Sequence, residues 1–226
     1  MYAAAHTSLA LLAKRQHPTR SLLGFMAAAQ GAELAWVALS YTGIEHPTID
    51  AHGTLHLEYI PYSHSLLFGF GGALLLWALL RYLARRPQAA TAMGLLFASH
   101  VVLDLIQHEP NIRLVPWMTH PTFGLNLQAH PWWDFAIETG LCLACWAYYR
   151  GGRKLLVALV ALNVANLPLM LAGEGGASPM AHNRFILPTV ILGTILLAWA
   201  VVGRYARDTS ALRTPAATPQ AAGVAS

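Results

Sequence analysis

Long apolar runs recur along this chain, and each is close to the length that crosses a lipid bilayer. A transmembrane helix needs about 17 to 25 predominantly apolar residues. Six runs reach that length, near residues 21–44, 64–84, 89–108, 132–149, 154–173 and 184–203. Composition agrees, because 56% of the residues are hydrophobic and 11% are charged, whereas soluble domains carry about 25% charged residues. We therefore predict an all-α, polytopic membrane protein with about six transmembrane helices.

The two ends of the chain fall outside this pattern. The N-terminal stretch MYAAAHTSLALLAKR is apolar but too short to cross a bilayer. Because no small-residue cleavage site follows it, we do not interpret it as a signal peptide. We expect instead a short N-terminal helix that lies on the membrane surface or dips partway into it. From Thr209 the chain is rich in Ala, Pro and Thr, which predicts a disordered tail over 209–226 after a single helical domain over 1–208.

Basic residues are distributed unevenly between the two sides of the predicted bundle. Twelve of the 14 Lys and Arg residues fall on the side that holds both chain ends, and only Arg113 and Arg184 fall on the other. The twelve are Lys14, Arg15, Arg20, Arg81, Arg85, Arg86, Arg150, Arg153, Lys154, Arg204, Arg207 and Arg213. Because short basic loops stay in the cytoplasm, we predict that both termini are cytoplasmic. The expected partner is the lipid bilayer, and no nucleic-acid partner is expected.

The third apolar run ends in SHVVLDLIQHEPN, which places His100, Asp104 and His108 four residues apart. Groups at i, i+4 and i+8 share one slowly drifting face of an α-helix. An aspartate inside a bilayer costs around 2.5 kcal/mol or more unless it is paired or hydrated. We therefore favour a functional or ligand role for Asp104 over purely structural pairing.

Other histidines and carboxylates gather on the same, non-cytoplasmic side. Glu33, His64 and Glu138 lie within the predicted spans or at their outer ends. A one-sided cluster of imidazole and carboxylate groups is what a divalent metal requires. We predict a site for a divalent metal, with Zn²⁺ favoured, that faces away from the cytoplasm. Its candidate ligands are His64, His100, Asp104 and His108.

Plainer explanations compete for several of these residues. Glu33 and Glu138 could equally satisfy polar groups on neighbouring helices. Asp134 lies near a helix start, where a carboxylate is stabilised as a cap. Cys142 and Cys145 form a C-x-x-C pattern, but they lie among Leu, Ala and Trp in the inner part of a span. Their position favours packing over redox chemistry.

Several blocks of the sequence together resemble a known family. They are HTSLALLAKR, QGAELAWVALSYTGIEH, YIPYSHSLLFG, SHVVLDLIQHEPN and GLNLQAHPWWDFAIETGL. The chain is similar, to about residue 150, to bacterial multi-pass membrane proteins related to the inner-membrane-associated metal-dependent hydrolases. SHSLL and SHxxLDxxxHxP are the most specific of these blocks, and the last two predicted spans carry little motif.

The resemblance implies a bacterial inner-membrane location, a hydrolase activity and a set of site residues. These residues are His6, Glu33, His64, His100, Asp104, His108 and Glu138. Two departures stand out, because the family usually has aspartate at the position of Glu33 and often Arg-Pro-Asp at 109–111. The first change keeps a carboxylate, whereas the second weakens any role for that loop. His6 fits the predicted topology only if the N-terminal helix re-enters partway and approaches Glu33.

We expect an enzyme in which a metal-activated water attacks a phosphoester or acyl ester of a lipid-linked substrate. Glu138 or Glu33 would serve as the general base. A cation or proton transporter would use the same cluster, but it needs a polar path through both halves of the membrane. A non-catalytic scaffold or haem binder, with His64 and His100 as axial ligands, is the third alternative.

The predicted topology leads to a labelling experiment. In a background without Cys142 and Cys145, a cysteine introduced at His52 should react with an impermeant reagent in intact cells, because loop 45–63 is expected outside. A cysteine at Arg85 should react only after permeabilisation. The reverse pattern would refute both the topology and the outward-facing site.

Overall fold

The structure, a computed structural model, describes residues 3–46, 48–49, 55–56, 60–181 and 183–210. Helices dominate this described part. The α-helices are α1 (Ala3–Gln16), α2 (Leu22–Ala29), α3 (Gly31–Thr42), α4 (Leu66–Ala78), α5 (Pro87–Gln107), α6 (Pro131–Tyr149), α7 (Arg153–Ala181) and α8 (Ile186–Ser210). A π-helical turn, η1 (Leu79–Leu83), extends α4, and a 3₁₀ turn, η2 (Leu127–Ala129), precedes α6. Two antiparallel pairs of two-residue strands complete the fold, β1 (Thr48–Ile49) with β2 (Leu55–His56) and β3 (Ile112–Arg113) with β4 (Thr122–Phe123).

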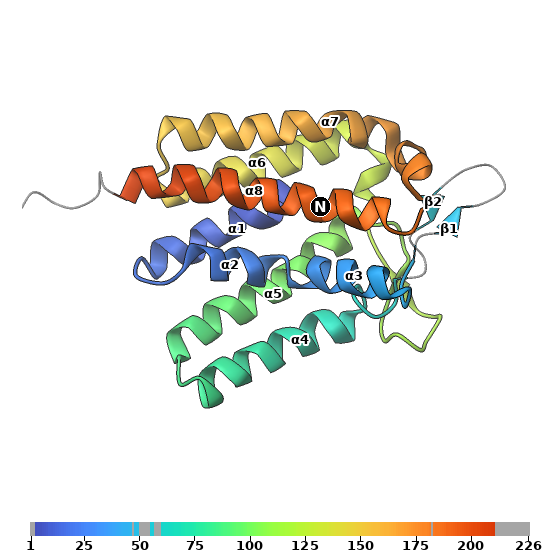
Figure 1. The fold of residues 1–226 in the computed structure, drawn as a ribbon, viewed down its shortest axis with the longest axis horizontal. Coiled ribbons are helices and arrows are strands. Elements are labelled where there is room, and N and C mark those ends of the chain that lie inside the picture. The colour runs from blue at the N-terminus through green and yellow to red at the C-terminus, as the bar shows by residue number, and fades with distance from the viewer. Residues whose placement is uncertain (1–2, 47, 50–54, 57–59, 182, 211–226) are drawn as a thin grey trace, which may run out of the picture.

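The helices run along one long axis, and the two ends of the bundle differ (Figure 1). The strands β1 and β2 lie at one end, together with the long connection between α5 and α6. The opposite end holds three short turns, at 17–21, 84–86 and 150–152, and the last turns of α8. Most of the basic residues belong to these turns or flank them. The grouping of basic residues inferred from the sequence therefore corresponds to one end of the bundle.

The prediction of an all-α fold is confirmed, whereas six spans do not fit the structure. By length and composition, four helical segments among the described residues could cross a membrane, at Leu66–Leu83, Pro87–Gln107, Arg153–Leu171 and Ile186–Ala206. A fifth is possible if α2 and α3, which are bent by 64°, count as one broken span. The expected span at 132–149 corresponds to α6, which is 19 residues long but carries Asp134 and Glu138 and does not reach the same apolarity.

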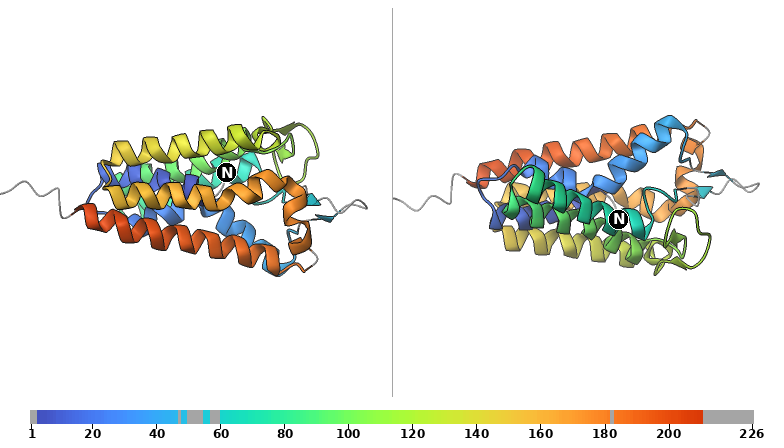
Figure 2. Two further views of the ribbon diagram at one scale, coloured as in Figure 1. Left: turned by 90° about the horizontal axis from the view of Figure 1, so that it is seen from above. Right: turned by 90° about the horizontal axis from the view of Figure 1, so that it is seen from below.

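Helix α1 lies inside the bundle although it is only 14 residues long. It contacts α2, α5, α6, α7 and α8, and the further views show it enclosed by other helices (Figure 2). Its buried residues are small or medium in size, among them Ala4, Ala5, Ser8 and Ala10, and small residues let neighbouring helices approach closely. Helix α1 thus packs among the other helices of the bundle, which brings His6 into the interior.

The boundary between α2 and α3 is a helix break held by one buried side chain. Gln30 donates from Nε2 to the carbonyl of Ala3 at 3.0 Å and accepts from Trp199 Nε1 at 2.8 Å. These two bonds join the break to the start of α1 and to α8. Because the helix breaks here, the carbonyl of Ala29 is available to a donor from another helix.

Glycines allow α4 and α5 to pack closely. A Cβ atom at Gly69 would lie 2.7 Å from Val101 Cβ, and one at Gly72 would lie 2.8 Å from the Phe97 ring. A Cβ atom at Gly71, on the same helix, would meet only Leu67 Cδ1 at an ordinary 3.7 Å. The close approach matters for the site, because α5 supplies two of its residues.

We predict that Gly69→Ala lowers the thermal stability of the purified protein, at a cost of about 1 to 3 kcal/mol for overpacking. Gly71→Ala is the matched control and should be neutral or slightly stabilising, because alanine is the better helix former. Equal melting temperatures for the two variants would contradict the close packing of α4 on α5.

Candidate metal centre

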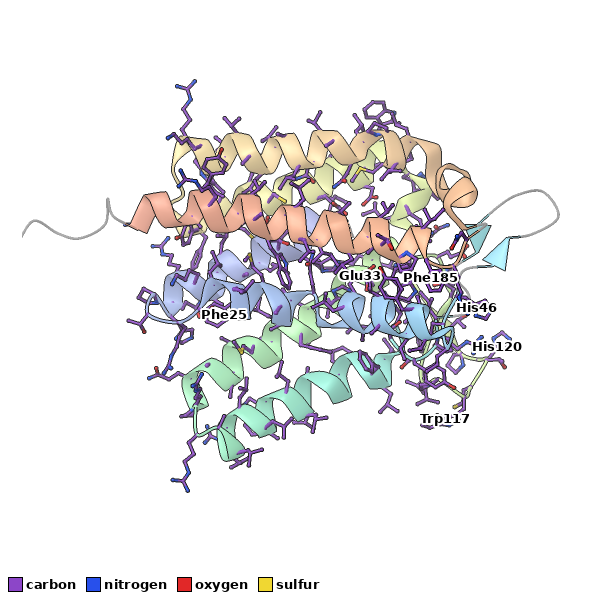
Figure 3. The ribbon with its side chains drawn as sticks, viewed as in Figure 1. Phe25, Glu33, His46, Trp117, His120 and Phe185 are labelled. Atoms are coloured by element: carbon purple, nitrogen blue, oxygen red, sulfur yellow. The ribbon has the colours of Figure 1, made fainter. Side chains whose placement is uncertain are left out.

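Five titratable side chains from four parts of the chain meet inside the bundle. His6 comes from α1, Glu33 from the first turn of α3, His64 from the turn before α4, and His100 and Asp104 from one face of α5. Figure 3 labels Glu33, which lies near the middle of the bundle. These residues form two overlapping groups of possible metal ligands, His6 with His100 and Asp104, and Glu33 with His64 and His100.

Each of the two histidines His64 and His100 lies near ligand spacing from both carboxylates, Glu33 and Asp104. Glu33 Oε2 lies 3.4 Å from His64 Nε2 and 3.5 Å from His100 Nε2. Asp104 Oδ2 lies 3.8 Å from the first of these nitrogens and 3.1 Å from the second. Zinc bonds of about 2.0 to 2.2 Å place tetrahedral ligands about 3.3 to 3.6 Å apart.

Three of these four distances are longer than a good hydrogen bond, which spans about 2.7 to 3.2 Å. His100 Nε2 is fully buried and has no hydrogen-bond partner among the described residues. A buried polar nitrogen without a partner is costly. The spacing and this nitrogen together mark a buried His/Asp cluster that could hold a metal ion.

The ring of His100 is oriented by the helix break. Its Nδ1 lies 3.1 Å from the carbonyl oxygen of Ala29, and because a carbonyl only accepts, Nδ1 carries the hydrogen. The neutral ring then has its lone pair on Nε2, which faces Glu33 and Asp104. Histidine ligands of metals are commonly fixed in this way, through the nitrogen that does not bind the ion.

His64 is oriented by a relay of hydrogen bonds that ends at Glu45. Ser63 Oγ donates to Glu45 Oε2 at 2.6 Å and lies 2.8 Å from His64 Nδ1. Since its own hydrogen is used, the hydroxyl accepts from Nδ1–H, and His64 also presents the lone pair of Nε2 to the cluster. Glu45 Oε1 is held in turn by the backbone N–H groups of Tyr62 and Ser63, at 2.6 and 3.0 Å.

Sequence reasoning did not identify Glu45 and Ser63 as parts of the site. Glu45 is fully buried, yet in the sequence it is one acidic residue in an outer loop, 18 positions before Ser63. No helical periodicity links the two segments. The only available signal was the position of Ser63 directly beside His64.

His6 lies against the face of His100. The two rings stack with centroids 4.0 Å apart, and His6 Nε2 lies 3.6 Å from Asp104 Oδ1. His6 is buried, and burial disfavours the charged form of an imidazole. The neutral form is the one that binds metals. The structure thus places His6 beside the predicted ligands.

His108 lies beside the cluster but outside both ligand groups. Helix α5 ends at Gln107, and His108 has extended backbone angles of −69° and 150°, so it leaves the face that His100 and Asp104 share. Its ring centroid lies 5.9 Å from that of His64. Burial lowers the pKa of His108 to about 4. Because α5 ends before His108, only His100 and Asp104 of the expected i, i+4, i+8 set share a helix face.

Glu138 is fully buried on α6 and also lies outside the two ligand groups found in the described residues. Asp134, in the first turn of α6, accepts a hydrogen bond from Gln107 Nε2 at 3.0 Å. Cys142 and Cys145 are both buried. Ser8 and Asn163 donate to Cys142 Sγ at 3.2 and 3.3 Å, which fits a packing role for this cysteine.

Access to the cluster differs sharply among its members. The Glu33 side chain is 25% exposed, whereas the side chains of His6, His64, His100 and Asp104 are 7% exposed or less. The two ionised carboxylates carry two negative charges, which a divalent cation would balance. Water or a substrate would therefore approach the cluster on the Glu33 side.

The relay to His64 generates a prediction for zinc affinity. Glu45→Gln keeps the size of the side chain but removes the carboxylate that accepts from the Ser63 hydroxyl, so His64 should lose its fixed orientation. Zinc affinity should fall about 10- to 100-fold, the usual effect of losing such a supporting group, as measured by competition with a chelating dye. Glu109→Gln, in the loop after α5, is the control and should leave the affinity unchanged. Unchanged affinity in folded Glu45→Gln would show that Ser63 alone orients His64.

Comparison of the chain with models of protein families, with curated proteins and with solved structures finds no match. The chemical interpretation of the cluster therefore starts from its geometry, because no matched protein supplies one.

Proposed function

We propose that this chain is a membrane-embedded, zinc-dependent hydrolase that acts on a phosphoester or acyl ester of a lipid-linked substrate. The observation that carries the proposal is that the Nε2 atoms of two oriented histidines each lie 3.1 to 3.8 Å from an oxygen of both carboxylates, near the spacing of zinc ligands. The resemblance of the sequence to inner-membrane-associated metal-dependent hydrolases supports the same reaction class.

Zinc suits this donor set better than a hard cation does. Imidazole nitrogens mixed with carboxylate oxygens are typical zinc ligands, whereas Mg²⁺ and Ca²⁺ prefer six or more oxygens. His64, His100 and Asp104 are the proposed protein ligands, since catalytic zinc sites use three and leave one position open. His6 packs on His100 and faces the second oxygen of Asp104, so it steadies both.

Zinc would supply Lewis acidity that activates a water molecule near neutral pH. Glu33 is the proposed general base, because it is the most accessible carboxylate of the cluster and lies on the open side. A carboxylate in this position takes the proton of the attacking water and can return it to the leaving oxygen. Glu138, the other expected base, is less suited because it lies outside the ligand groups.

The surroundings of the cluster favour a lipid-linked substrate. The cluster is enclosed by helices that are apolar enough to cross a membrane, among them α4 and α5. A soluble substrate would have to leave water to reach it, whereas a lipid arrives from the bilayer itself. With the basic turns in the cytoplasm, the proposed location is the bacterial inner membrane, with both chain ends cytoplasmic and the site toward the outer side.

A transporter would need the polar path to continue toward the basic end of the bundle. Beyond the cluster, the buried polar groups Ser8 and Asn163 both donate to Cys142 Sγ. Farther along α1, the described core consists of apolar side chains, including Leu11, Phe25 and Leu155. This one-sided arrangement favours hydrolysis over transport.

The proposal is tested by zinc content and turnover in three variants. The parent should hold about one zinc ion per chain, and Asp104→Ala should lose it together with thermal stability. Glu33→Gln should keep the zinc but lower hydrolysis of phospholipids or acyl esters by about 10²- to 10⁴-fold, the usual contribution of a general base. Glu138→Gln, another buried carboxylate, is the matched control and should keep both zinc and turnover.

Each part of the proposal has its own contrary result. Loss of zinc from Glu33→Gln would make Glu33 a ligand rather than the base. Zinc-loaded parent protein without turnover on any substrate of the panel would refute the hydrolase and favour the transporter. A Soret band in the purified protein would refute the zinc centre and indicate haem.

A further inference from the structure

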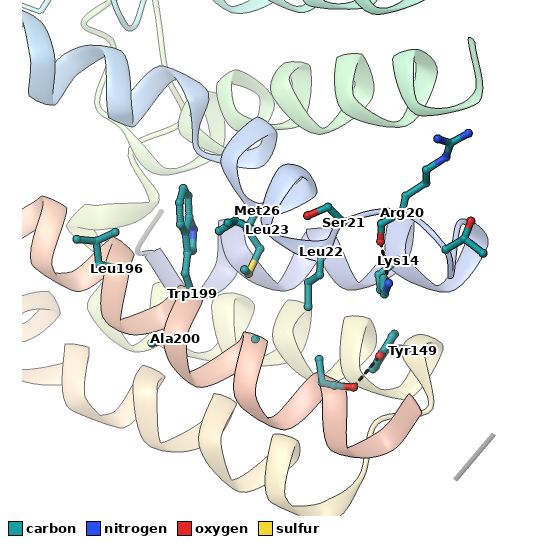
Figure 4. Close-up of a pocket in the computed structure, with 13 residues that line it drawn as sticks. Lys14, Arg20, Ser21, Leu22, Leu23, Met26, Tyr149, Leu196, Trp199 and Ala200 are labelled. Carbon is teal, nitrogen blue, oxygen red and sulfur yellow. Dashed lines mark hydrogen bonds between the residues drawn. The ribbon is translucent and has the colours of Figure 1, made fainter. Parts of the chain in front are cut away.

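A second hollow lies at the basic end of the bundle, away from the metal centre. It has a volume of about 760 Å³ and is bordered by the end of α1, the turn at 17–21, the start of α2 and the last half of α8. Figure 4 shows Lys14 toward one end of this groove and Leu196 and Trp199 toward the other, while the Arg20 side chain points away from it. The groove therefore has one cationic end and one apolar end.

Lys14 is held at the cationic end by two hydrogen bonds, and its ammonium group can donate a third. Its Nζ donates to the carbonyl oxygens of Pro18 and Arg20 at 2.6 and 2.7 Å. An ammonium group has three hydrogens, so one remains for an acceptor in the groove. Among the described residues no carboxylate forms an ion pair with Lys14. Its side chain is only half-buried, so an anion can reach it.

The apolar end opens to the side of the bundle. Leu23 is 57% exposed and Leu196 is 51% exposed, and both border the groove together with Trp199. Residues 186–206 of α8 form one of the segments apolar enough to cross a membrane, so this side faces hydrocarbon if the segment spans. The cationic end then lies at the depth of the lipid headgroups, beside the other basic turns.

We propose that this groove binds one anionic phospholipid. Its phosphate accepts from the Lys14 ammonium, and one acyl chain lies along Leu23, Leu196 and Trp199. A volume of about 760 Å³ falls in the range of small-molecule sites, about 300 to 1,000 Å³. Charge complementarity selects an anionic headgroup, and the apolar lining selects a lipid over free phosphate. The site is independent of the metal centre and of the proposed hydrolysis.

The test uses purified full-length protein in mixed micelles of phosphatidylglycerol and phosphatidylcholine at equal amounts, with retained lipid measured by native mass spectrometry. Phosphatidylglycerol should be retained at least fivefold over phosphatidylcholine, since each basic residue near an anionic surface contributes about a fivefold preference. Lys14→Gln should lower this preference about fivefold. Ala200→Phe should lower total lipid retention by filling the exposed wall of the groove.

Arg86→Gln is the matched control, because Arg86 is an exposed basic residue at the same end of the bundle but outside the groove. An equal loss of preference in Arg86→Gln and Lys14→Gln would show general attraction to anionic lipid and would refute the site. Equal retention of the two lipids by the parent would refute it as well. Displacement of phosphatidylglycerol by millimolar inorganic phosphate would show that the groove binds free phosphate instead.

Discussion

The break between α2 and α3 at Gln30 is the feature on which both the packing and the metal centre depend. The Gln30 side chain ties the break to α1 and α8, and the Ala29 carbonyl beside it fixes the ring of His100. An uninterrupted helix would have used that carbonyl in its own hydrogen-bond ladder. At the break, the Ala29 carbonyl makes no hydrogen bond within the helix and instead accepts from His100 Nδ1. This bond leaves Nε2 of His100 to face the two carboxylates.

Burial of these carboxylates explains why so many helices converge on one place. An ionised carboxylate in an apolar bundle is costly unless it is paired or binds a cation. Glu33 and Asp104 come from different helices and share the same two histidines. His64 comes from a third segment, so the cluster joins α3, α4 and α5 as well as offering ligands to an ion.

The helical class and the pairing of His100 with Asp104 follow from the sequence, because hydropathy and a four-residue spacing are local properties. His108 shows the limit of this reasoning, since periodicity cannot reveal that the helix ends one residue earlier. Glu45 shows another limit, because its link to His64 is made through tertiary contacts. The sequence predicts more spans than the structure supports, for two reasons. The helix break at Gln30 lies within one apolar run, and Asp134 and Glu138 lie within another. Neither interruption is visible from mean hydropathy.

The shortness of α1 has a consequence for how the protein is made. A helix of 14 residues rises about 21 Å, less than the hydrocarbon thickness of about 30 Å, so it is a poor candidate to insert by itself. It is enclosed only once α5, α6, α7 and α8 have gathered around it, although it is synthesised before all of them. His6 accordingly reaches Asp104 only after these helices, which are synthesised later than α1, have come together.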